Sequence, residues 1–237
     1  MAILVGTSGY NYPEWRGSFY PEKFATAKML PYYAERFSTV EINYTFYRMP
    51  NAKTIATWNA ETPAGFVFTL KASRKITHDA RLKDVDENLA YFLDTAAALG
   101  PKLGPILFQL PPYFRKSADH LTRLEAVLAR LPAGLRAAFE FRHASWFGDD
   151  VYALLKHRNA ALCIADNEDD TTPVVATADF GYFRLRDEGY GSEDLRTWAE
   201  TVRRLGTGWR DAFIYFKHEE SGTGPALAQE FRSLLSA

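Results

Sequence analysis

Short apolar segments alternate with helix-like segments along the whole chain, and this pattern constrains the fold more than any other feature. A helix-like segment follows seven of the eight apolar runs, and only a short polar stretch at 167–179 follows the sixth. Alternating strand and helix patterns predict βαβ units and a parallel sheet. The predicted strands are 3–8, 39–43, 66–72, 105–110, 136–142, 161–166, 180–186 and 212–218.

Eight parallel strands most simply close into a TIM-type (β/α)₈ barrel, which takes about 250 residues. The chain has 237 residues and no linker rich in Gly, Ser or Pro, so we expect one barrel domain over 1–237. The helix after the sixth strand is expected to be abbreviated. An open, doubly wound α/β sheet is the alternative.

Apolar and polar residues alternate within six of the predicted strands. In 39–43, for example, Val40 and Ile42 share one face, whereas Glu41 and Asn43 share the other. A face covered by helices must be apolar, because a buried unpaired charge is very costly. The polar face is therefore predicted to line the barrel interior, with its charges near the C-terminal opening.

Active sites of TIM barrels are built at this C-terminal opening. An ion-pair network that merely fills a polar core is the alternative interpretation. The predicted ring of polar side chains comprises Glu41, Asn43, Lys71, Gln109, Glu140, Arg142, Asp166, Arg184, Arg186, Tyr215 and Lys217.

Five residues of the ring are the candidate catalytic groups. Glu41 and Glu140 are predicted to act as acid and base. Lys71 and Arg142 are predicted to stabilise developing negative charge, and Asp166 completes the set. Lys71 can instead pair with Glu41, or form a Schiff base with a carbonyl substrate if it is desolvated.

Three cations on the last two strands predict an anion site. Arg184, Arg186 and Lys217 are like charges side by side, which is unfavourable without a compensating anion. Gly222 and Gly224 precede a predicted helix whose N-terminal N–H groups can bind an anion. In the alternative interpretation these cations are neutralised by nearby acids, namely Asp187, Glu188, Glu219 and Glu220.

The loops after the first two strands are rich in aromatic residues. We expect Tyr10, Tyr47 and Arg48 to contact a ligand, because polar-tipped aromatics stack on sugars and bases. Trp15 and Phe19 are expected to pack within their loop. The remaining predicted substrate contacts are Asn43, His78, Gln109 and Trp146.

No cofactor is predicted, and a divalent metal is only a weak alternative. His78, His143 and His218 follow predicted strands, but no HxH or HExxH spacing accompanies them. The single cysteine, Cys163, excludes an intramolecular disulfide and lies in an apolar run typical of a buried core thiol.

Composition bounds the location and the partners. No apolar run approaches the roughly 18 residues that span a membrane. The N-terminus lacks the basic region and apolar stretch of a secretory signal, so a cytoplasmic protein with no membrane partner is expected. The net charge of −1 provides no general attraction to nucleic acid.

Six motifs in order resemble the domain of unknown function 72 family, also called YecE-like: GTSGYNYPEWRGSFYP, TVEINYTFYRMP, TPAGFVFTLKASRKITH, LGPKLGPILFQLPP, FEFRHASW and ALCIAD. The resemblance covers nearly the whole chain and implies a β/α barrel. It places the family's motif positions at Tyr10, Trp15, Glu41, Phe46, Tyr47, Arg48, Lys71, His78, Gln109, Glu140, Arg142, Trp146 and Asp166.

The last third departs from the resemblance. Many members carry His-Gly after strand 7 and Asn-Asn or Asn-Asp after strand 8. Here those places hold Leu185-Arg186 and Lys217-His218, which indicates a more basic opening.

Three function classes remain open. The first is an enzyme that acts on a small anionic or phosphorylated, sugar-like substrate. The second is a protein that binds nucleic acid or cleaves phosphodiesters, by analogy with endonuclease IV-like barrels. The third is a non-catalytic module that binds a small molecule. The sequence leaves the oligomeric state open.

Overall fold

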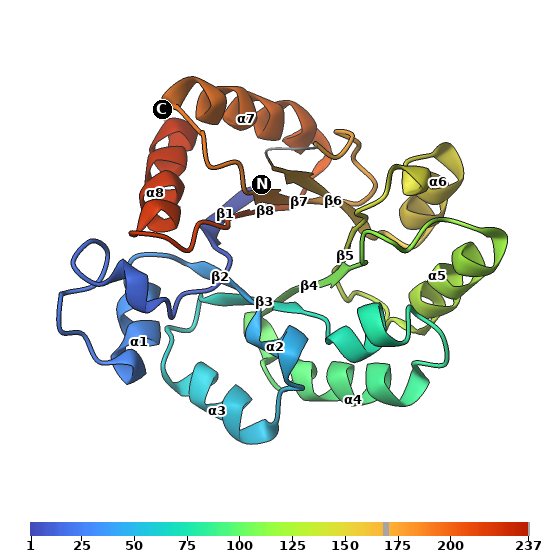
Figure 1. Cartoon of the computed structure of the whole chain (residues 1–237), viewed down its shortest axis with the longest axis horizontal. Helices are drawn as coiled ribbons and strands as arrows, with labels where there is room; N and C mark the ends of the chain where they lie inside the picture. The colour runs from blue at the N-terminus through green and yellow to red at the C-terminus, as the bar shows by residue number, and fades with distance from the viewer. Residues whose placement is uncertain (168–170, 237) are drawn as a thin grey trace.

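The computed structural model describes residues 1–167 and 171–236, and its eight strands form one parallel sheet. The strand order is β1-β8-β7-β6-β5-β4-β3-β2, so the first and last strands pair and the sheet rolls into a barrel (Figure 1). This confirms the TIM-type α/β fold. The strands are β1 Ala2–Thr7, β2 Thr39–Ile42, β3 Val67–Lys71, β4 Leu103–Gln109, β5 Ala137–Glu140, β6 Ala161–Asp166, β7 Phe180–Leu185 and β8 Asp211–Phe216.

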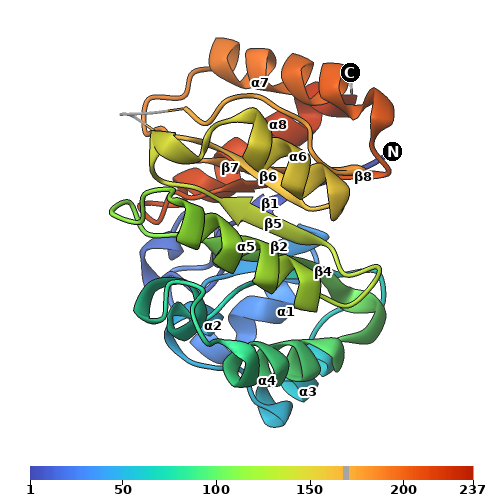
Figure 2. The same ribbon diagram turned by 90° about the vertical axis from the view of Figure 1, so that its right-hand side faces the viewer.

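Helices surround the strands, with α7 and α8 on one side and α3 and α4 on the opposite side (Figure 2). Asn51 and Ser117 accept hydrogen bonds from the backbone N–H groups of Thr54 and His120, which fixes the starts of α3 and α5. The helices are α1 Met29–Ala34, α2 Tyr44–Tyr47, α3 Ala52–Ala60, α4 Asp86–Ala97, α5 Ala118–Arg130, α6 Asp149–His157, α7 Ser192–Leu205 and α8 Thr223–Ser236.

The connection between β6 and β7 contains no helix in its described part, residue 167 and residues 171–179, where an abbreviated helix was expected. Residues 168–170 lie outside the described residues. Across residues 1–167 and 171–236, every helix is too short or too polar to span a lipid bilayer.

Each face of the sheet packs into its own apolar cluster. The larger one contains alternate strand residues such as Val40, Phe68 and Phe139, packed against the helices. The smaller one fills the barrel interior with Cys163, which is fully buried as predicted, and with Leu107 and other side chains. The predicted assignment of the outer and inner faces is therefore confirmed for these strands.

The barrel closes where β1 meets β2, and few contacts join the two strands there. We call this edge the β1–β2 junction. A bridge joins Ser8 to Glu41 beyond the end of β1. The Tyr33 hydroxyl accepts a hydrogen bond from the Thr7 amide at 2.9 Å and donates one to the Thr39 carbonyl at 3.0 Å. A Cβ on Gly6 would lie 2.2 Å from that carbonyl oxygen, so only glycine permits this approach.

Candidate functional site

Arg184 of β7 lies at the centre of a buried ion triad inside the barrel. Its guanidinium contacts Glu41 of β2 at 2.9 Å and Glu140 of β5 at 2.6 Å. The arginine is 1% exposed and both carboxylates are 0% exposed. The triad therefore links three strands across the interior near their C-terminal ends.

Further donors complete the coordination of the two carboxylates. Glu41 accepts hydrogen bonds from the Ser8 hydroxyl and, at 2.5 Å, from the Tyr182 hydroxyl. Glu140 accepts one from the Arg142 guanidinium. Charge-assisted hydrogen bonds of this kind offset the cost of burying a carboxylate. Both acids are thus held in place as anions.

The pKa values agree with this geometry. Burial alone raises the pKa of Glu41, but Arg184 and the Ser8 hydroxyl outweigh it and the pKa is lowered. Burial likewise opposes the effect of Arg184 and Arg142 on Glu140, and the pKa of Glu140 falls to about 2. A group that stays ionised so far below neutrality is a poor acid or base at pH 7. The geometry therefore favours an orienting role over the predicted acid–base role.

The amine of Lys71, at the end of β3, has a pKa far below that of an ordinary lysine. Its Nζ lies 4.4 Å from the centroid of the Phe46 ring, and among the described residues it has no hydrogen bond or ion pair. Burial, and then the Arg184 charge, lower the pKa of Lys71 to about 7, although Glu140 and Glu41 oppose the shift. A substantial fraction of this amine is therefore uncharged at neutral pH.

Three more cations extend the positive charge toward solvent. Arg142 is 25% exposed and Lys217 is 31% exposed. Burial, Arg142 and Arg184 lower the pKa of Arg186. Burial, Arg184 and Arg186 lower the pKa of Lys217.

Among the described side chains gathered here, cations outnumber carboxylates. Five cationic side chains lie around two carboxylates, and Glu219 lies 3.6 Å from the Lys217 amine. Arg186 Nη1 is buried and has no hydrogen-bond partner in the described chain. We call these residues the mouth cluster: Glu41, Lys71, Glu140, Arg142, Arg184, Arg186 and Lys217.

Two predicted amides adjoin the mouth cluster. Gln109 accepts a hydrogen bond from Arg184 at 3.3 Å. Asn43 donates one to the Ser8 hydroxyl at 2.8 Å, and its Oδ1 is buried without a partner among the residues described. Tyr215 lies inside the barrel as predicted, where its hydroxyl bonds those of Thr39 and Thr69 at 2.8 Å each.

Sequence reasoning missed Ser8 and Tyr182, both of which contact Glu41. The position of each residue along its strand could have identified it. Tyr182 lies two residues before Arg184 and so shares its face of β7. Ser8 lies four residues after Leu4, which packs against the interior cluster.

Asp166 does not join the mouth cluster, so its predicted place in the ring was wrong. Its carboxylate accepts hydrogen bonds from the Tyr190 hydroxyl at 2.6 Å and from the Trp198 indole of α7 at 3.3 Å. Cys163 and Ala165 are the interior residues of β6, and strand alternation therefore turns Asp166 outward.

The predicted substrate contact of Trp146 was also wrong. Trp146 is 0% exposed, and its indole donates a hydrogen bond to the Phe114 carbonyl at 2.6 Å. Its ring stacks on Phe141 with 5.0 Å between centroids. Its role is to anchor the loop after β5.

Gly222 and Gly224 pack against the chain itself. Gly222 has a φ of +77° and a Cβ there would lie 2.3 Å from the Ser18 hydroxyl oxygen, whereas a Cβ on Gly224 would lie 2.8 Å from the His218 carbonyl. Arg184 is already paired with two buried carboxylates. Joint binding of an anion by Arg184, Lys217 and the backbone of these glycines stays a prediction, and the structure places Arg184 with Glu41 and Glu140.

The remaining predicted contacts lie around the cluster. His78 packs edge-on against Phe46 with 4.8 Å between ring centroids, and burial and Lys71 lower the pKa of His78 to about 4. Tyr47 is 74% exposed and Arg48 is also exposed. Tyr10 lines a separate cavity of about 270 Å³ beside Asn43.

Trp15 and Phe19 pack edge to face within their loop, as expected.

The three histidines considered as metal ligands are engaged locally. His143 accepts a hydrogen bond from the Ser145 amide, and His218 Nε2 contacts the Asp187 carbonyl at 2.7 Å. Within residues 1–167 and 171–236, no three His, Cys, Asp or Glu side chains gather as a metal site requires.

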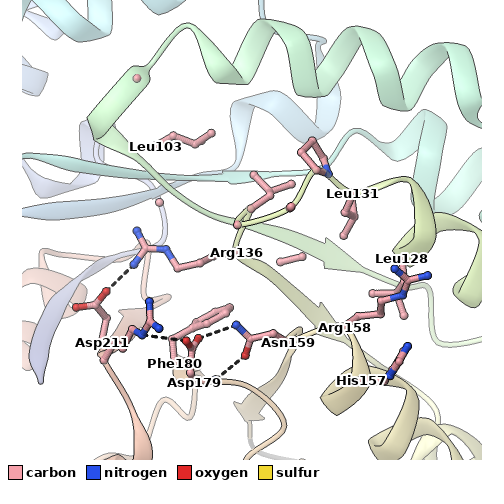
Figure 3. A pocket seen from close by; sticks show the side chains of 18 residues that line it. Leu103, Leu128, Leu131, Arg136, His157, Arg158, Asn159, Asp179, Phe180 and Asp211 are labelled. Atoms are coloured by element: carbon pink, nitrogen blue, oxygen red, sulfur yellow. Dashed lines mark hydrogen bonds and ion pairs between the residues drawn. The ribbon is translucent and has the colours of Figure 1, made fainter.

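A cavity lies at the opposite, N-terminal end of the barrel (Figure 3). Its volume is about 660 Å³. Arg136 pairs there with Asp211 at 2.6 Å, and Arg210 pairs with Asp179 at 3.1 Å. None of the mouth cluster lines this cavity, and in barrels of this type that end serves stability.

Comparison with known proteins identifies relatives of this barrel. The chain is 24% identical to the UPF0759 protein YunF of Bacillus subtilis, an alignment that covers 98% of this chain and 94% of YunF. It is 29% identical to the UPF0759 protein YecE of Escherichia coli over 61% of this chain and half of YecE.

Solved structures agree with the fold. A DUF72 family protein from Thermotoga maritima superposes with a TM-score of 0.90 at 26% identity, with both chains fully covered. D-psicose 3-epimerase from Clostridium cellulolyticum shares the fold alone, with a TM-score of 0.55, 14% identity and coverage of 100% of this chain and 97% of the epimerase. The family described as "Protein of unknown function DUF72" matches residues 4–237, and the chain therefore belongs to the DUF72 family.

Proposed function

We propose that this chain is an enzyme that acts on a small anionic substrate at the C-terminal opening of its barrel. Arg142, Arg186 and Lys217 bind the anion, and Lys71 supplies the reactive amine. The carboxylates Glu41 and Glu140 hold Arg184 in place inside the barrel, and Glu140 also orients Arg142.

One observation carries the proposal: Arg186 Nη1 is buried without an acceptor in the described chain, next to other cations. A buried donor that lacks a partner costs about 1–3 kcal/mol. An anionic ligand supplies both the missing acceptor and the missing negative charge. The planar guanidinium favours carboxylate and phosphate groups, which it can bind through two parallel hydrogen bonds.

A phosphorylated or carboxylated sugar-like compound fits this charge pattern. D-psicose 3-epimerase is a sugar enzyme with the same barrel fold, but this likeness is an analogy of fold only. The argument for an anion therefore depends on the side chains of the mouth cluster.

Titration calorimetry with inorganic phosphate tests the binding step. We expect saturable binding that weakens at least about tenfold in Arg186→Ala, the loss of roughly 1.4 kcal/mol of charge-assisted contact. The matched control is Arg210→Ala, which removes an exposed arginine at the other end of the barrel and leaves binding unchanged. Equal weakening in both variants would contradict the assignment.

A turnover screen tests the catalytic step. Phosphorylated sugars and small carboxylates are incubated with the protein and with Lys71→Met, and products are detected by NMR. We expect turnover that the variant loses. Binding without turnover of any compound would indicate the non-catalytic module instead. Tighter binding of single-stranded oligonucleotides than of phosphate, with steep salt dependence, would indicate a nucleic-acid protein.

A further inference from the structure

We infer that Lys71 acts as a nucleophile that forms an imine with the carbonyl carbon of a small oxo acid. This inference rests on the proposed function and narrows its substrate class to compounds with a carbonyl group close to a carboxylate or phosphate. The amine attacks the carbonyl, while Arg142, Arg186 and Lys217 hold the anionic group.

First, the Lys71 amine has no ion-pair partner within residues 1–167 and 171–236. Nine of the other lysines and arginines in the described chain form ion pairs with single exposed or half-exposed acids, as Lys116 does with Asp150 at 2.7 Å. Lys71 has no such partner among the described residues, although two carboxylates lie nearby on β2 and β5. Arg184 already occupies both of those carboxylates.

The second argument is the environment of the amine. The Phe46 ring covers one side of Nζ, and the charges of Arg184 and Lys217 disfavour the ammonium form. A lysine that is desolvated and adjacent to other cations is activated as a nucleophile toward carbonyl groups. The same surroundings give little help to a general base, because protonating the amine adds another charge to a positive cluster.

The third argument links the carbonyl to the anion. The mouth cluster already attracts an anionic group toward the strand ends where Lys71 emerges. An oxo acid carries such a group within a few bonds of its carbonyl carbon. Holding the two reacting atoms together greatly raises their effective concentration, so the anion site promotes attack by the amine.

The covalent step balances without any co-reactant. The amine nitrogen attacks the carbonyl carbon, and a C–N bond forms while the C–O π bond breaks. The carbonyl oxygen leaves as water with the two hydrogens of the neutral amine, and the product is the imine. A proton from solvent converts it to the iminium ion, which carries the same charge as the original ammonium group.

Reductive trapping with pyruvate as the probe tests the inference on the full-length protein. Sodium borohydride transfers a hydride to the iminium carbon and leaves a stable secondary amine, which peptide mass spectrometry locates. At pH 7 we expect Lys71 to be labelled more than about tenfold faster than an ordinary lysine, because a far larger fraction of its amine is neutral. Exposed Lys53 is the internal reference.

Three controls make the outcome decisive. Lys71→Arg keeps a positive charge and must abolish labelling of that peptide. Acetone, a ketone without an anionic group, must label Lys71 much more slowly than pyruvate. Inorganic phosphate must slow labelling by pyruvate, since it competes for the anion site.

Failure of the inference is distinguishable from failure of the proposed function. If Lys71 is labelled no faster than Lys53, while phosphate still binds and turnover still requires Lys71, the imine is excluded and the enzyme remains. If phosphate binding also survives Arg186→Ala unchanged, the anion site itself is excluded. Equal labelling by acetone and pyruvate would overturn the oxo acid as the substrate class.

Discussion

The two ends of the barrel both carry arginines and acids, but they balance their charges differently. At the N-terminal end two of the three arginines around a cavity of about 660 Å³ each pair with an aspartate, Arg136 with Asp211 and Arg210 with Asp179. At the C-terminal end Arg142 and Arg184 share two buried carboxylates, and Lys71 and Arg186 have no ion pair within the described residues. This cavity thus lies beside paired charges, whereas Lys71 and Arg186 of the mouth cluster lie at the other end.

The comparison of the two ends indicates that the volume of a cavity and the charges of a binding site are separate properties. Paired, half-exposed charges contribute little to stability and leave no unused binding capacity. Unmatched cations are unfavourable for the empty protein, and a ligand of opposite charge relieves that cost.

Replacing the central cation should give the largest effect. Arg184→Met leaves Glu41 and Glu140 buried without their shared partner, and breaking such a buried pair costs about 3–5 kcal/mol. Urea unfolding measures the loss. Adding Glu41→Gln and Glu140→Gln to the same chain should restore part of the stability. A loss below about 1 kcal/mol would show that the triad is no different from a surface pair.

Removing the Lys71 amine should stabilise the protein at pH 6. Folding lowers the pKa of Lys71 from 10.5 to about 7, so the unfolded chain binds more protons between these values. The amine therefore opposes folding below pH 7, and this cost disappears as the pH rises toward 10.5. We expect Lys71→Met to raise the free energy of unfolding by about 2 kcal/mol at pH 6, after discounting for solvent contact. A gain that persists at pH 10 would contradict this cause.

Inorganic phosphate should stabilise the protein through the mouth cluster alone. At ten times its dissociation constant, a ligand raises the free energy of unfolding by about 1.4 kcal/mol. Thermal unfolding with and without phosphate measures this shift. Arg186→Ala should remove most of it and Arg210→Ala should keep it. The reverse result would assign the anion site to the N-terminal end.

The smallest effect is expected at the N-terminal end. Arg136 and Asp211 are about 30% exposed, at 31% and 28%, and pairs of this kind contribute roughly 0.2–1 kcal/mol. Arg136→Gln should therefore shift the urea midpoint only slightly and leave phosphate binding intact. A loss comparable with that of Arg184→Met would remove the contrast between the two ends.

The eight strands and the composition of their faces could be predicted from the sequence. Side-chain alternation has a strict period of two, so Glu41, Glu140 and Arg184 were correctly placed on one interior surface. The same rule, applied one residue further along β6, would have turned Asp166 outward. The error lay in assigning a residue to the ring because it ends a strand.

The residues in loops could not be placed in this way. Trp146 follows β5 in a segment without periodicity, so nothing in the sequence distinguishes an exposed indole from one that is bound to the Phe114 carbonyl. The pairing of Arg184 depends on three strands that are distant in sequence. A pattern along one strand predicts which face a charge occupies, but it does not predict which partner neutralises it.

The β1–β2 junction has a consequence for the motion of the barrel. One bridge, the side-chain hydrogen bonds of Ser8 and the Tyr33 hydroxyl hold this edge, whereas β1 and β8 pair along six residues. Local opening requires the least free energy where the fewest contacts are broken. Amide hydrogens of β2 that face this edge should therefore exchange with deuterium before those between β7 and β8. Tyr33→Phe should increase this difference in exchange rate, since it removes the hydrogen bonds of the Tyr33 hydroxyl and keeps the aromatic ring.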